Sequence, residues 1–348
     1  HDLNKKKNEA WQLGKNYFKI TFPLSDSAKI KNKDEYLASG TINFNATANN
    51  DGSVQYIYIG DLHGQLWKLD ANQADFTQSA EENWSLSKLS SYIYNSNPIP
   101  LYVAKDKDGT NQPISMSPTL AYGPNGSFIV GFGTGKYLEG IDNSVNNDTQ
   151  IQSFYVIFDD NKSFLISNDS NKGRSFLAQA SVDSSNQIKT SSFIWKAPSI
   201  SNGSKYKSGW YIDLPNSGSS GGERQVTSAA LFGKQNIINT LQPPSSSTSA
   251  CGGGSSITYT AELTTGIGNV SALSNDALGA PVLISLGFTY SATGAVGDRV
   301  KTQKVGIINP SATGPGNNIQ TKEAEFQVGR LNWRQIHNYR ELKNMEWK

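Results

Sequence analysis

The sequence predicts an all-β protein assembled from many short hairpins. Two observations carry this prediction. Hydrophobic residues make up 36% of the 348 residues and charged residues only 17%, and Ser, Thr, Asn and Gly fill the difference. That mixture is poor in helix formers and rich in turn formers. From about residue 54 onward, short apolar runs bounded by Gly, Asn, Asp or Pro also recur with almost no helical periodicity.

The clearest hairpin spans residues 54–70. Val54–Asp61 is rich in aromatic and β-branched residues, Leu62-His63-Gly64 forms a turn, and Gln65–Asp70 is a second strand that carries Trp67. We expect the two strands to pair and Trp67 to lie in the core.

Further runs have the same pattern of an apolar strand followed by a Gly or Asp turn. They are 126–135, 152–159, 209–215, 256–263 and 281–287. Trp210 lies inside one of them and is expected in the core, and the apolar run 281–287 predicts a strand buried on both faces. Repeated hairpins at irregular spacing predict a propeller or a sandwich. Because a propeller blade takes about 40–50 residues, the chain could hold up to roughly seven lean blades.

Charge, hydropathy and cysteine content exclude several classes of protein. The chain has 31 Lys and Arg residues and 29 Asp and Glu residues, so it lacks the excess of positive charge that would attract nucleic acid. No apolar stretch approaches 18 residues, so no transmembrane helix is expected. Cys251 is the only cysteine, so any disulfide partner lies outside this sequence. The opening His1-Asp2-Leu3-Asn4 carries no signal peptide, and we expect the chain to be part of a longer protein.

The residues that catalysis needs are scarce. His1 is terminal, His63 lies in a hairpin turn, His337 lies in a polar tail, and none has a spaced partner that indicates a triad or a metal site. Gly131–Lys136 is rich in glycine, but it lacks the spacing and the following helix of a phosphate loop. We interpret it as a bend between blade strands, and we predict that the protein is not an enzyme.

One loop carries a calcium hypothesis. Thr47, Asn49, Asp51, Ser53 and Gln55 place oxygen atoms at alternate positions, with a glycine sixth for the sharp turn, as in an EF-hand loop. Positions one and nine, Thr47 and Gln55, lack the expected carboxylates, so Asp51 alone supplies charge. Calcium affinity rises with the number of charged ligands, which predicts weak binding or none. The alternative is an Asn-Asp-Gly turn that leads into the strand from Val54.

Several motifs follow one another in an order that resembles the C-terminal domain of the PilY1/PilC family of type IV pilus-associated adhesins. They are Tyr58–Asp70, Gln112–Pro118, Phe132–Glu139, Gln152–Tyr155, Gly209–Pro215, Gly222–Arg224, Cys251–Gly254 and Trp333–Gln335. Together with the loop that begins at Thr47, they span residues 47 to about 335.

The resemblance implies a modified seven-bladed β-propeller, of which this chain is expected to hold only the later blades. We assign 1–348 to one partial propeller domain, with 1–40 and 336–348 assigned to no blade. The family implies a protein exported through the periplasm to the pilus tip or outer membrane of a Gram-negative bacterium. Its implied roles are pilus biogenesis by opposing retraction, twitching motility and adherence to host cells. The implied partners are minor pilins, the pilus machinery and a host-cell receptor, and the family's calcium loop maps onto Thr47 to Gln55.

Two other classes of function stay open. A quinoprotein-like dehydrogenase propeller also uses Gly-Asp and Trp hairpins, and it would need a calcium-bound quinone beside a catalytic carboxylate. A lectin-like propeller would stack exposed Trp and Tyr rings on sugars. Under any binding function, the long polar loops of a rigid scaffold are the expected binding elements.

Overall fold

In the computed structural model, the regular secondary structure of the described residues is almost all β-strand, which confirms the predicted all-β class. The structure describes residues 6–13, 16–25, 37–74, 84–123, 126–143, 145, 150–162, 172–195, 205–214, 222–244, 254–290, 299–311 and 319–328. Within these ranges, no helix is long and apolar enough to cross a membrane.

A four-stranded antiparallel sheet, here called the first unit, contains the predicted hairpin. Its strands, in sheet order, are β1 (Thr41–Ala48), β2 (Val54–Asp61), β3 (Gln65–Asp70) and β6 (Tyr102–Val103). The β2–β3 turn is held by Asp61, whose Oδ1 accepts hydrogen bonds from the backbone amides of His63 and Gln65 at 2.9 Å each. Short polar side chains that bond their own turn in this way favour tight hairpins.

Eight strands of a larger sheet form two more four-stranded antiparallel units. The second unit comprises, in sheet order, β7 (Thr119–Tyr122), β8 (Phe128–Gly133), β9 (Ser153–Asp159) and β14 (Gly209–Asp213). The third unit comprises β15 (Ala230–Phe232), β16 (Gln235–Asn239), β17 (Thr258–Glu262) and β18 (Gly268–Val270). Four-stranded antiparallel sheets are the unit from which propeller blades are built.

A hairpin joins the edges of the second and third units. Its strands are β10 (Ala178–Val182) and β11 (Gln187–Thr190). β10 pairs in parallel with β14, and β11 pairs antiparallel with β18, so ten strands make one continuous sheet. The hairpin therefore links the second and third units through hydrogen-bonded strands.

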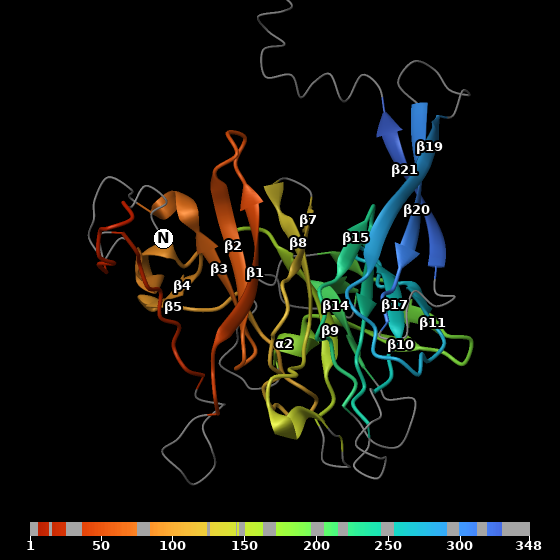
Figure 1. The fold of residues 1–348 in the computed structure, drawn as a ribbon, viewed down its shortest axis with the longest axis horizontal. Coiled ribbons are helices and arrows are strands. Elements are labelled where there is room, and N and C mark those ends of the chain that lie inside the picture. The colour runs from red at the N-terminus through yellow and green to blue at the C-terminus, as the bar shows by residue number, and fades with distance from the viewer. Residues whose placement is uncertain are drawn as a thin grey trace, which may run out of the picture.

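The second unit is buried on both faces because its side chains alternate between two cores. Phe128, Val130 and Tyr155 pack with residues of the first unit, whereas Ile129 and Val156 pack with residues of the third unit. Successive side chains of a strand point to opposite faces, so one apolar strand can serve two cores. Figure 1 shows β8 and β9 between β1–β3 on one side and β17 on the other. Trp67 and Trp210 are both 0% exposed, as predicted.

A third core lies on the far face of the first unit. Trp67 and Leu69 of β3 pack there against Leu86 and Leu89 of α1 (Leu86–Leu89). The shorter elements are η2 (Ala71–Gln73), β4 (Ile93–Tyr94), β5 (Asn97–Pro98), η5 (Gly140–Asn143), α2 (Lys172–Ser175), β12 (Ile194–Trp195) and β13 (Tyr206–Lys207).

The last described strands form a separate three-stranded sheet. They are β19 (Val282–Tyr290), β20 (Arg299–Ile308) and β21 (Ile319–Val328), and they project away from the other sheets (Figure 1). The expectation that 281–287 is buried on both faces is wrong, because Val282, Ile284 and Leu286 are 46%, 45% and 53% exposed. A strand is buried on two faces only where other layers cover both.

Candidate functional site

The predicted calcium loop is a tight turn between β1 and β2. The Asn49 amide donates to the Ser53 carbonyl at 2.7 Å, and Gly52 adopts a left-handed φ of 86° that favours glycine. Asp51 Oδ1 accepts hydrogen bonds from both the backbone amide and the hydroxyl of Ser53, at 2.9 and 2.6 Å. These bonds lower the pKa of Asp51. The loop therefore satisfies its own polar groups as a hairpin turn does.

The oxygen atoms of this loop do not fit a calcium site of high affinity. The Thr47 hydroxyl accepts from the Tyr56 amide at 3.1 Å, and Asn49 donates its side-chain amide to Ser53 and Asn72. In an EF-hand loop counted from Thr47, position twelve supplies a bidentate Glu. Tyr58 occupies that position here and is 0% exposed in the core. Among the described residues, no three His, Cys, Asp or Glu side chains gather to hold a metal ion.

The other residues singled out from the sequence have structural roles where the structure describes them. His63 is buried, with Nδ1 accepting from the Ser25 amide at 3.1 Å and Nε2 2.7 Å from the Leu37 carbonyl oxygen. A Cβ on Gly133, at the end of β8, would lie 2.0 Å from Gln225 Oε1, so close packing explains this glycine. His1, His337 and Cys251 lie outside the described residues.

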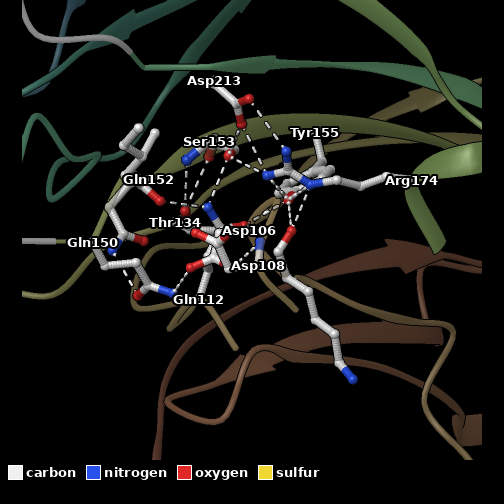
Figure 2. Close-up of polar contacts among 12 residues, drawn as sticks. Asp106, Asp108, Gln112, Thr134, Gln150, Gln152, Ser153, Tyr155, Arg174 and Asp213 are labelled. Atoms are coloured by element: carbon white, nitrogen blue, oxygen red, sulfur yellow. Dashed lines mark hydrogen bonds and ion pairs between the residues drawn. The ribbon is translucent and has the colours of Figure 1, made fainter. Parts of the chain in front are cut away.

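A polar network around Arg174 lies beside the core shared by the first and second units (Figure 2). Arg174 Nη2 donates to Ser153 Oγ and to the Tyr155 hydroxyl at 2.8 Å each, and it forms a 2.9 Å ion pair with Asp213. The Tyr155 hydroxyl in turn lies 2.5 Å from Gln112 Oε1. Burial raises the pKa of Tyr155, which keeps it a hydrogen-bond donor. Sequence reasoning missed this network because its members are dispersed along the chain.

A buried ion pair joins the first and second units. Lys68 Nζ of β3 lies 2.7 Å from Asp159 Oδ2 of β9, and both side chains are 0% exposed. Asp159 also accepts hydrogen bonds from the hydroxyls of Tyr58, at 2.6 Å, and Tyr92. The side-chain oxygen of Asn161 contacts Lys68 Nζ as well. Burial lowers the pKa of Lys68 although Asp159 acts in the opposite direction.

Glu223 is a buried acid with a shifted pKa. It is 1% exposed, and its Oε1 accepts a 2.6 Å hydrogen bond from Thr240. Burial raises the pKa of Glu223 to about 7, a value suited to proton transfer near neutral pH. A general acid or base must reach its substrate, however, and this carboxyl is enclosed in the protein.

Comparison with known proteins identifies related sequences and a related fold. Residues 34–194 match the family model of the PilY1 beta-propeller domain. A type IV pilus biogenesis factor PilY1 homolog from Xylella fastidiosa is 31% identical over 206 residues, which cover 58% of this chain and 13% of that protein. Type IV pilus biogenesis factor PilY1 from Pseudomonas aeruginosa strain PAO1 is 30% identical over 217 residues, which cover 57% of this chain and 18% of that protein.

A solved structure supports the same fold. The crystal structure of the Pseudomonas aeruginosa PilY1 C-terminal domain aligns with a TM-score of 0.53 at 22% identity, over 84% of this chain and 62% of that one. Together with the family model, this likeness confirms the predicted β-propeller fold. The chain spans less than a fifth of the length of the two relatives named above.

Proposed function

We propose, from the match of residues 34–194 to the family model of the PilY1 beta-propeller domain, that this chain serves type IV pilus biogenesis by binding other proteins and not by catalysing a reaction. The observation that carries the proposal is the sequence match to pilus biogenesis factors from two bacteria. The whole relatives are much longer, so the chain would supply the propeller part of such a factor.

The positions of the reactive side chains support binding over catalysis. Lys68, Arg174 and Glu223 are the kinds of group that enzymes use, but here each is engaged in bonds within or between propeller units. Perturbed pKa values accompany structural ion-pair networks as well as active sites. The buried indoles of Trp67 and Trp210 are likewise enclosed and do not serve as sugar-stacking platforms.

The proposed partners are minor pilins and the type IV pilus machinery, with a host-cell receptor as a further partner. The proposed location is the cell surface of a Gram-negative bacterium, at the pilus tip or outer membrane. A rigid scaffold that presents polar loops is the usual way in which such binding surfaces are built. In this role the protein would oppose pilus retraction and so support twitching motility and adherence.

Deletion of the gene tests the proposal directly. We expect fewer surface pili by electron microscopy and reduced twitching zones, both restored by the gene supplied in trans. Normal piliation and normal twitching in the deletion strain would overturn the proposed function.

A second deletion separates extension from adherence. If the protein opposes retraction, removing the retraction motor as well should restore surface pili. If the protein is also the adhesin, those pili should still fail to attach the bacteria to host cells. Restored adherence in the double mutant would remove the adhesin role while leaving the biogenesis role in place.

A further inference from the structure

Lys68, Asp159 and Asn161 form a cluster whose chemistry goes beyond an ion pair. Lys68 Nζ contacts the side-chain oxygen of Asn161 and lies 2.7 Å from Asp159 Oδ2. An amine, a carboxamide and a carboxyl group thus meet at one point. We infer that Lys68 and Asn161 are joined by an isopeptide bond formed with Asp159 as the proton carrier.

Burial of Lys68 removes its amine from water, which favours the uncharged form that such a bond requires. The ammonium group is enclosed by four aromatic rings whose centroids lie 4.1 to 5.8 Å from Nζ, and these rings belong to Tyr56, Tyr58, Tyr92 and Phe128. Removal from water disfavours the charged form of a lysine and makes its nitrogen a nucleophile. The lowered pKa of Lys68 agrees with this effect.

The backbone holds Asn161 in place for attack. Asn161 follows β9 in a left-handed conformation with φ of 62°, which asparagine tolerates better than most residues. Its backbone amide donates to Asp159 Oδ1 at 3.0 Å, and its side-chain Nδ2 donates to the Gly126 carbonyl at 2.8 Å. These two bonds fix the carboxamide so that its oxygen faces Lys68. Positioning of this kind supplies much of the barrier reduction in intramolecular reactions.

The atoms of the reaction balance without any further reagent. The Lys68 ammonium passes one proton to Asp159, and the neutral Nζ attacks Cγ of Asn161. The Nζ–Cγ bond forms, the Cγ–Nδ2 bond breaks, and Asp159 returns its proton to the departing nitrogen while it accepts one from Nζ. Ammonia takes the remaining proton from Asp159 and leaves as ammonium, so the products are the Lys68–Asn161 amide, ammonium and the Asp159 carboxylate. Asn161 is exposed, so ammonia has a route to solvent.

The bond would link the first unit to the second covalently. Lys68 and Asn161 are 93 positions apart in the sequence, one on β3 and the other just after β9. A covalent tie between neighbouring units would prevent them from separating under load. This inference does not rest on the proposed function, because it concerns the chain's own chemistry.

Mass spectrometry of the denatured protein tests the inference. We expect an intact mass about 17 Da below that of the sequence, the mass of one ammonia lost when the lysine amine displaces it. A protease digest should contain the Lys68 peptide joined to the Asn161 peptide. An unshifted mass overturns the inference, and so does a shifted mass with unlinked peptides, because a succinimide at Asn161 loses ammonia too.

Variants assign the roles within the cluster. Lys68→Arg and Asn161→Ala should each restore the full mass, and Lys207→Arg is the matched control because Lys207 donates to the Ser175 carbonyl and should leave the shift unchanged. Asp159→Asn keeps the shape of the side chain but cannot carry the proton, so the link should be lost. A link that persists in Asp159→Asn would overturn the role of Asp159. Even if a variant fails to fold, the mass of the wild-type protein decides whether Lys68 and Asn161 are covalently joined.

Discussion

The hydroxyl of Tyr58 donates a 2.6 Å hydrogen bond to the carboxylate of Asp159, across the interface between the first and second propeller units. The two residues are 101 positions apart in the sequence. Desolvation and the neighbouring carboxylate raise the pKa of Tyr58, so the hydroxyl keeps its proton and donates this bond at neutral pH. The bond therefore stabilises the contact between units that local sequence cannot specify.

The first prediction concerns this bond. Tyr58→Phe removes the hydroxyl while keeping the ring, and we expect the free energy of unfolding to fall by about 1.5–3 kcal/mol, the range for a buried hydrogen bond to a charged group. Urea unfolding followed by tryptophan fluorescence measures the change. Tyr122→Phe is the matched control, since Tyr122 is 77% exposed and its loss should cost less than about 0.5 kcal/mol. Equal effects of the two substitutions would contradict the prediction.

The second prediction concerns the turn between β2 and β3. Gly64 has a left-handed φ of 76°, and a Cβ there would lie 2.6 Å from the Gln112 carbonyl oxygen and 2.8 Å from that of Ala104. Gly64→Ala combines an unfavourable φ with a backbone clash, so we expect a loss of about 1–3 kcal/mol or more in urea unfolding. At Gly140 a Cβ meets nothing within 4 Å and φ is not left-handed, so Gly140→Ala should be nearly neutral. An unchanged free energy of unfolding in Gly64→Ala would contradict the prediction, because it would mean that the turn moves to remove the clash.

The hairpin at Gly64 could be predicted from sequence, whereas its partners could not. Alternation of apolar residues and the Gly turn placed β2, β3 and Trp67 correctly, because both signals are local. Lys68 and Asp159 lie in strands that were predicted, yet nothing local indicates that a charged side chain is buried or which residue neutralises it. That pairing depends on how the units pack.

Strand β19 was predicted correctly as a strand, but its burial was not. Its apolar run predicts a strand correctly, and the inference of burial on both faces fails because burial depends on neighbouring layers. Leu286 is 53% exposed in a sheet whose described surroundings leave that side chain open. Composition and periodicity give the strand, while the environment of each face comes from tertiary packing alone.

The third prediction is a pH dependence from Glu223. Burial raises the pKa of Glu223 to about 7 from an ordinary value of 4.5, so the folded state retains a proton that the unfolded state releases between these two values. This contribution to stability is complete below about pH 4.5, declines as pH rises toward 7, and is lost above it. At 1.36 kcal/mol per pKa unit the contribution amounts to roughly 3 kcal/mol.

Comparison of Glu223→Gln with the wild type isolates this contribution. The glutamine cannot ionise, so the stability of the variant relative to the wild type should increase between pH 4 and pH 8 by roughly 3 kcal/mol in urea unfolding. Glu323→Gln is the control, because Glu323 is 58% exposed and its substitution should add no such slope. A difference between Glu223→Gln and wild type that is constant with pH would show that Glu223 ionises in the folded protein as it does in the unfolded chain.

The fourth prediction concerns calcium at the turn between β1 and β2. Only Asp51 carries charge among the proposed ligands, and its Oδ1 already accepts two hydrogen bonds from Ser53. A calcium ion would have to replace those bonds and draw in oxygens that now serve the turn, such as the Thr47 hydroxyl bonded to the Tyr56 amide. Because affinity rises with the number of carboxylate ligands, we expect isothermal titration calorimetry to detect no sub-micromolar calcium binding.

A variant makes the calcium prediction specific to this loop. Asp51→Ala should leave any weak binding heat unchanged, because heat from other surface carboxylates does not depend on Asp51. The same substitution should reduce the free energy of unfolding, since the turn loses the acceptor for the Ser53 amide. Sub-micromolar binding that disappears in Asp51→Ala would contradict the prediction, and it would mean that the loop rearranges around the ion and gives up the Ser53 bonds that hold it as a turn.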